Sequence, residues 1–125
     1  MIARRIGGTL AGIVTAGLVI FAVEGAGLLL LSGGVAVDPA RAALPMLLSV
    51  VLAWFLGALG GGLVAARIAR WKWAPQIVGA FVLLGILANA MAMPQPLWMT
   101  LAGAALAWLA ARYAATRAER RTVPA

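Results

Sequence analysis

IGGTLAGIVTAGLVIFAVEGAGLLLL, residues 6–31, is an apolar run interrupted by a single charged residue, Glu24. A helix that crosses the hydrocarbon core of a bilayer needs about 20 apolar residues, and this run is long enough. Three further apolar runs follow it, and the helices that they predict lie at about residues 44–69, 74–93 and 97–116. The sequence therefore predicts an all-α fold, a polytopic transmembrane four-helix bundle.

The composition of the chain agrees with a membrane environment. Its 125 residues are 65% hydrophobic and only 10% charged, whereas a soluble domain is about half apolar and about a quarter charged. So small a globule cannot hide that much apolar surface from water. We expect residues 1–116 to form a single transmembrane domain and residues 117–125 a polar cytoplasmic tail. The net charge of +7 then favours lipid headgroups, and not nucleic acid, as the partner of the basic residues.

The residues that carry most enzyme chemistry are scarce in this sequence. Cysteine and histidine are absent, and the only acidic residues are Glu24, Asp38 and Glu119, in different parts of the chain. Thiolate chemistry, the commonest general base and a carboxylate-lined metal site are therefore excluded or disfavoured. We expect no enzymatic activity, no cofactor and no metal.

Lysine and arginine placement predicts the orientation, because cytoplasmic loops are enriched in both. The connections between the predicted helices are short, so sequential helices should be antiparallel neighbours in an up-down bundle. In that topology Arg41 alone lies on one side, and nine of the ten basic residues lie on the other: Arg4, Arg5, Arg67, Arg70, Lys72, Arg112, Arg117, Arg120 and Arg121. Both termini are therefore predicted to be cytoplasmic, in a bacterial cytoplasmic (inner) membrane.

Small residues recur at every fourth position in the first, second and fourth predicted helices, and in the first helix they are Gly8, Gly12 and Ala16. Such stripes let helices approach closely in lipid, where no hydrophobic force drives their association. The stripes have two interpretations, packing within one chain or a dimerisation seam of a homo-oligomer. The packing candidates are Gly57, Gly61 and Ala65 in the second helix and Gly103 and Ala107 in the fourth.

Each predicted helix contributes one polar residue to the outer half of the membrane. At 1.5 Å per residue, Glu24 lies roughly 27 Å and Asn89 roughly 22 Å along their helices from the cytoplasmic side. Ser49 and Thr100 lie early in helices that descend from the outer side. We expect Glu24 to point into the bundle and to form a hydrogen bond with Asn89 or a hydroxyl group.

An acidic residue inside a membrane segment is a candidate functional group. With no intramembrane cation beside it, a neutral, protonated Glu24 is expected at pH 7. Three roles stay open: a structural hydrogen bond, a proton- or cation-binding carboxyl in a translocation path, and a contact to a partner protein or lipid. A translocation path requires a wet or ligand-sized cavity that reaches Glu24, whereas a structural role requires a dry, closed contact.

One glutamate in the first of four short helices resembles the small multidrug resistance transporters, whose glutamate binds protons and cationic drugs. The chain departs from that family in its strong charge bias and in the few aromatic residues of its second and third helices. Only the chemistry is retained, as the alternative hypothesis of a small proton- or cation-coupled transporter or channel.

Three other segments resemble a group of small bacterial four-helix membrane proteins of unknown function: LGALGGGLVAAR at 56–67, GILAN at 85–89 and MPQPLW at 93–98. The resemblance implies a fold and a bacterial cytoplasmic membrane, but no activity. The function predicted first is that of a non-enzymatic structural or accessory membrane subunit, which packs with itself or with a larger membrane complex.

Overall fold

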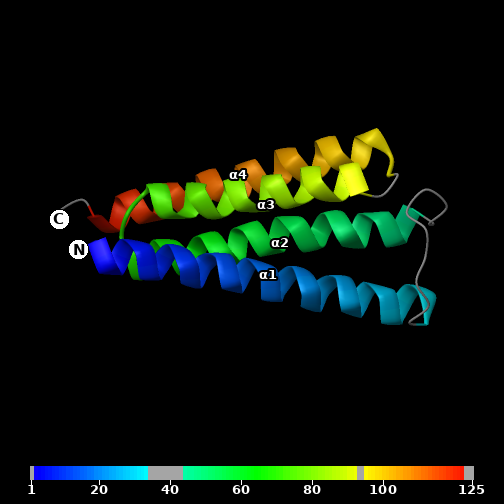
Figure 1. The fold of residues 1–125 in the computed structure, drawn as a ribbon, viewed down its shortest axis with the longest axis horizontal. Coiled ribbons are helices and arrows are strands. Elements are labelled where there is room, and N and C mark those ends of the chain that lie inside the picture. Colours follow the sequence, from blue (N-terminus) through cyan, green and yellow to red (C-terminus); the bar gives the residue numbers. More distant parts are fainter. Residues whose placement is uncertain (1, 34–43, 93–94, 123–125) are drawn as a thin grey trace.

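The computed structural model describes residues 2–33, 44–92 and 95–122, and this part of the chain is all-helical. It contains four helices, which Figure 1 shows side by side along the long axis. Their bounds are α1 Ile2–Ser32, α2 Leu44–Ala69, α3 Trp73–Ala92 and α4 Leu97–Thr122.

The helix bounds follow the apolar runs closely but not at every end. α2 has the predicted bounds, whereas α1 begins four residues earlier than predicted, at Ile2. α4 continues to Thr122, so most of the tail predicted at 117–125 is helical. The apolar run sets only the part of a helix that lies in lipid, and arginine, alanine and glutamate are good helix formers that extend it. The connection at 32–43 falls mostly outside the described residues.

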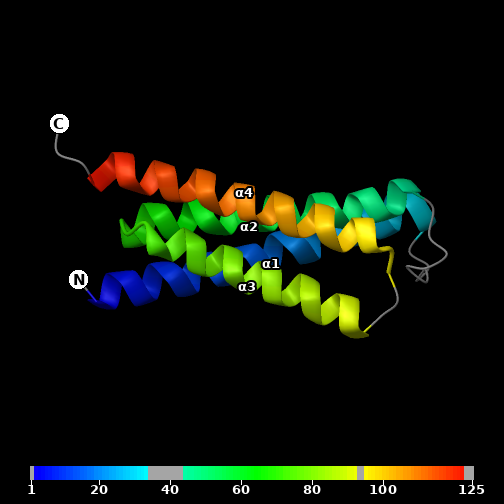
Figure 2. The same cartoon turned by 90° about the horizontal axis from the view of Figure 1, so that it is seen from above.

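Helix α2 is the centre of the arrangement. Both α2 and α3 contact all three other helices, and α2 has the more extensive contacts with α1 and α4; within the described residues, α1 and α4 do not contact each other. In both views the labelled N and C ends lie at the same end of the molecule, and the colours show each helix running back along the one before it (Figures 1 and 2). That end carries the start of α1, the end of α2, the start of α3 and the end of α4.

The core between the helices consists largely of small side chains. Ala16, Ala53, Ala58, Ala65, Ala74, Ala107, Ala111, Ala114 and Ala118 are all completely buried. Large apolar side chains lie mostly outside, for example Phe21 at 79% and Leu84 at 67% exposure. A soluble protein rarely exposes so much apolar surface in one place, whereas lipid solvates it.

Three of the described helices, α1, α2 and α3, are long and apolar enough to cross a membrane, by length and composition. Helix α4 is not among the helices that are long and apolar enough to cross a membrane, because its apolar part ends at Arg112. Its buried face nevertheless packs on the other helices. A side chain on Gly79 of α3 would meet Ala111, and one on Gly62 of α2 would lie 3.0 Å from the Ala114 Cβ.

Candidate functional site

Two of the four predicted polar residues are joined by a third that the sequence analysis did not select. The Asn89 side-chain amide at the end of α3 donates to the Gln95 Oε1 at 2.9 Å. The Gln95 Nε2 in turn donates to the Thr100 hydroxyl in α4 at 2.6 Å. Gln95 thus bridges α3 and α4 across their short connection. Its place between Pro94 and Pro96, in the short connection between two predicted helices, is the sequence signal that could have indicated it.

Ser49 satisfies its hydrogen bond within its own helix. Its hydroxyl donates to the Met46 carbonyl oxygen at 2.6 Å. Its side chain also lies against α1, where a Cβ built on Gly27 would be 2.7 Å from the Ser49 Oγ. Ser49 therefore marks a close contact between α1 and α2, three residues beyond Glu24, and serves packing in this structure.

Glu24 lies in a cavity of about 180 Å³ between α1, α2 and α3. Asn89 lines the same cavity, so the two residues predicted to share a depth and a face do meet there. The remaining lining is apolar or aromatic: Ile20, Trp54, Phe81, Val82, Gly85 and Ile86. At about 30 Å³ per molecule of liquid water, the cavity has room for roughly six waters.

The predicted hydrogen bond from Glu24 to Asn89 or to a hydroxyl group is not found among the residues that the structure describes. The Asn89 amide is directed to Gln95, which is only six residues away along the chain. Among the residues that the structure describes, no hydrogen bond joins the Glu24 carboxyl to another side chain or to a neighbouring backbone group. Glu24 is partly buried and is one of the residues that line the cavity, so there is space beside it for a partner that the described residues do not supply.

The small residues selected from the sequence all lie in contacts between helices of one chain. A Cβ on Gly57 would meet Ile20, and a Cβ on Gly61 would meet the Gly12 carbonyl oxygen. The Ala65 Cβ lies 2.6 Å from the Cβ position of Gly12.

The two candidates in α4 lie against α2 and α3. A Cβ on Gly103 would meet the Trp54 ring, and Ala107 is fully buried with its carbonyl oxygen 3.9 Å from the Cβ position of Gly79. A dimerisation seam on the same stripes would have to compete with these intramolecular contacts.

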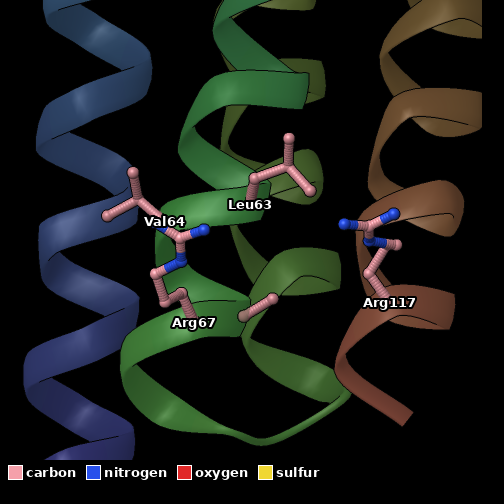
Figure 3. A pocket seen from close by; sticks show the side chains of 5 residues that line it. Leu63, Val64, Arg67 and Arg117 are labelled. Atoms are coloured by element: carbon pink, nitrogen blue, oxygen red, sulfur yellow. The ribbon is translucent and has the colours of Figure 1, made fainter. Parts of the chain in front are cut away.

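Two basic cavities lie at the opposite end of the bundle from Glu24. One, of about 260 Å³, lies between α2 and α4. Figure 3 shows two of the arginines that line it, Arg67 and Arg117, on either side of Leu63. The other, of about 430 Å³, is lined by Arg4, Arg5, Ala69 and Arg70. Neither was predicted as a site, although the charge bias placed these arginines at one end.

The fold and the cavities define an all-helical protein with three helices that are long and apolar enough to cross a membrane. No family model, no curated protein and no solved structure matches this chain.

Proposed function

We propose that this protein is a non-enzymatic, multi-pass protein of a bacterial cytoplasmic membrane, in which all four helices cross as an up-down bundle. The buried alanines of α4 support its inclusion, since that helix packs on α2 and α3 along its length. Arg112 at the end of its apolar part can extend its side chain to the interface. The positive-inside rule then puts both termini in the cytoplasm.

Within that bundle we propose that Glu24 binds a proton or a small cation, as part of a small transporter or channel. The observation that carries this proposal is the cavity of about 180 Å³ that Glu24 lines. A carboxyl group in an apolar setting is costly unless it is hydrogen-bonded or neutral. A cavity that holds water lowers that cost and lets the group exchange protons. Its volume is below the 300–1,000 Å³ of drug-sized ligand sites, which favours a proton or a bare cation as the ligand.

Infrared spectroscopy tests proton binding directly. With three acidic residues in the chain, the C=O stretching band of a protonated carboxyl group can be assigned by substitution. In membranes, Glu24→Gln should remove a band that titrates with pH, whereas Asp38→Asn and Glu119→Gln should leave it in place. A Glu24 band that does not respond to the pH of the medium would refute a water-connected site.

Proton flux in proteoliposomes tests transport. Vesicles that enclose a pH-sensitive dye should acidify faster with the wild-type protein than with Glu24→Gln or without protein. Gly85→Val is a second variant, because Gly85 lines the cavity and nothing lies within 4 Å of its Cβ position. The added side chain should fill the cavity and reduce flux while Glu24 is retained. Equal flux in all three proteins would refute the transport function.

The competing proposal is a structural or accessory subunit, and α1 offers the surface for it. Leu10, Val14, Leu18 and Phe21 form an exposed stripe on this helix, with exposures from 56% to 79%. In a membrane this stripe meets either lipid or another protein. Purification in mild detergent should then retain a partner or a homo-oligomer, and a cysteine at Leu18 should form cross-links that a cysteine at the equally exposed Leu84 does not. A monomer without cross-links at either position would argue against this role.

A further inference from the structure

The arginine triad, Arg4, Arg5 and Arg70, lies where α1 begins and α2 ends. These three residues and Ala69 line the cavity of about 430 Å³, and all three arginine side chains are exposed. Two of them belong to α1 and one to the connection between α2 and α3. The fold therefore brings three arginines, from segments that are far apart in the sequence, to the lining of one cavity.

A close contact between helix backbones fixes the position of the triad. A Cβ built on Gly8 would lie 2.6 Å from the Ala69 nitrogen and 2.8 Å from the Ala69 Cβ. Only glycine allows α1 to approach the end of α2 this closely. Arg4 and Arg5 lie one helical turn before Gly8, so the contact places them beside Ala69 and Arg70.

Arg5 is oriented by an aromatic neighbour. Its guanidinium carbon lies 5.0 Å from the centre of the Trp71 ring, a distance at which a cation is attracted by the face of the indole. The planar guanidinium group keeps its N–H donors free when it stacks on a ring. Trp71 thus limits the motion of Arg5 without neutralising its charge.

Arg70 has a backbone conformation that favours glycine. Its φ angle is 51°, and it is the only residue other than glycine with positive φ among those the structure describes. Its N–H donates to the Ala66 carbonyl oxygen at 3.0 Å, which ends α2 in a left-handed cap. Glycine would form this cap without strain, and strained residues concentrate at functional sites. A role for the guanidinium group would explain arginine at this position.

The charge of the triad is not balanced by the described part of the protein. Glu24 is the only acidic side chain that the structure describes, and it lies nineteen or more residues along the chain from each arginine of the triad. Three guanidinium groups around one cavity match the oxygens of a phosphate group, which they can bind in a bidentate manner. At the surface of a membrane, anionic phospholipids present such groups.

We propose that the arginine triad binds a phosphate group, supplied by the headgroup of an anionic phospholipid. The proposal rests on the membrane insertion proposed above and does not depend on Glu24. Native mass spectrometry of the full-length protein in detergent can measure the affinity for added phosphatidylglycerol, with phosphatidylcholine as the zwitterionic reference and inorganic phosphate as the soluble source.

Arg70→Gly and Arg5→Gln are the test variants. Arg70→Gly removes the guanidinium group and suits the left-handed cap, so the fold is retained. Each variant should weaken phosphatidylglycerol binding by about tenfold, the loss expected for one hydrogen bond to a charged group. The matched control, Arg67→Gln with Arg117→Gln, removes two charges from the other basic cavity (Figure 3). The affinity of this control for phosphatidylglycerol should stay within about twofold of that of the wild type, because charges outside the site attract the lipid only through screened electrostatics.

Four outcomes would overturn the proposal. They are a wild-type protein that binds no phosphatidylglycerol, equal binding of phosphatidylcholine, equal losses in the triad and control variants, and inorganic phosphate that competes fully at equal concentration. The last would leave a phosphate site but remove the lipid as its ligand. Failure of membrane insertion is separate, because it would be seen as extraction of all variants from membranes by alkaline carbonate.

Discussion

Helices α1 and α2 approach each other closely at Gly12 and Gly61, and one added methyl group tests that contact. A Cβ built on Gly12 would lie 2.6 Å from the Gly61 carbonyl oxygen, 2.6 Å from the Ala65 Cβ and 2.8 Å from the Val78 Cγ2. Ordinary van der Waals contact begins at 3.4 Å, so α1 must shift by about 0.8 Å, the difference between 3.4 and 2.6 Å. The neighbouring atoms are backbone or short side chains, which cannot rotate away.

The cost of Gly12→Ala follows from that shift. A gap of about 0.5–1 Å loses roughly a quarter to a half of the attraction between facing atoms. Overpacking of this kind costs about 1–3 kcal/mol. In lipid, close packing is a main source of helix association, so no hydrophobic gain offsets the loss. Gly12→Ala should therefore lower the free energy of unfolding by about 1–3 kcal/mol.

Equilibrium unfolding in mixed micelles, followed by circular dichroism, measures this change. Gly17→Ala is the matched control, since it makes the same substitution on the same helix with nothing within 4 Å of its Cβ position. The control should be neutral or slightly stabilising, because alanine is the better helix former. If the two variants had equal stability, the close contact between α1 and α2 would be refuted.

Three further predictions concern the loop, the topology and the acid. Gln95→Ala removes two hydrogen bonds that link α3 and α4 and should lower the free energy of unfolding by about 1–2 kcal/mol. Gln76→Ala, near the start of α3 and away from this bridge, is the control and should not; equal melting temperatures of the two variants would contradict the bridge. A cysteine at Val37 should be labelled by an impermeant reagent from outside and one at Thr122 should not, and the reverse pattern would overturn the orientation. Glu24→Gln should keep the melting temperature of the wild type, because glutamine can replace a protonated carboxyl group, and marked unfolding would contradict a neutral Glu24.

The positions of the helices could be predicted because the apolar runs and the turns between them are both distinct. The bounds of α2 are those predicted, since apolar sequence begins at Leu44 and basic residues end it near Ala69. The extension of α4 to Thr122 could not be predicted from hydropathy alone. It depends on buried alanines such as Ala118, which pack on the bundle beyond the apolar run.

The sequence was sufficient to predict how far along their helices Glu24 and Asn89 lie and which face of each helix they occupy, but not their hydrogen-bond partners. Helical rise and periodicity predicted that Glu24 and Asn89 lie at a similar level and face the bundle, and in the structure both line one cavity. The partner of Asn89 depended instead on the short connection that carries Gln95, where local geometry decides the direction of an amide. The basic cavities were missed because a charge bias predicts which side arginines occupy, and not which arginines helix packing brings together, as the contact of Gly8 with Ala69 does for the arginine triad.

The polar residues at the end of the bundle opposite the termini bear on the two hypotheses for Glu24. Ser49 donates to its own helix, and Asn89 and Thr100 are joined through Gln95, so each of these polar groups has a partner. Glu24 is the member of this group without one among the described residues, although a carboxyl group is the most costly of the four to leave unpaired. A purely structural glutamate would be expected where its hydrogen bonds are satisfied by protein. Its position on a cavity with room for water therefore favours the binding of a proton or cation over a structural role.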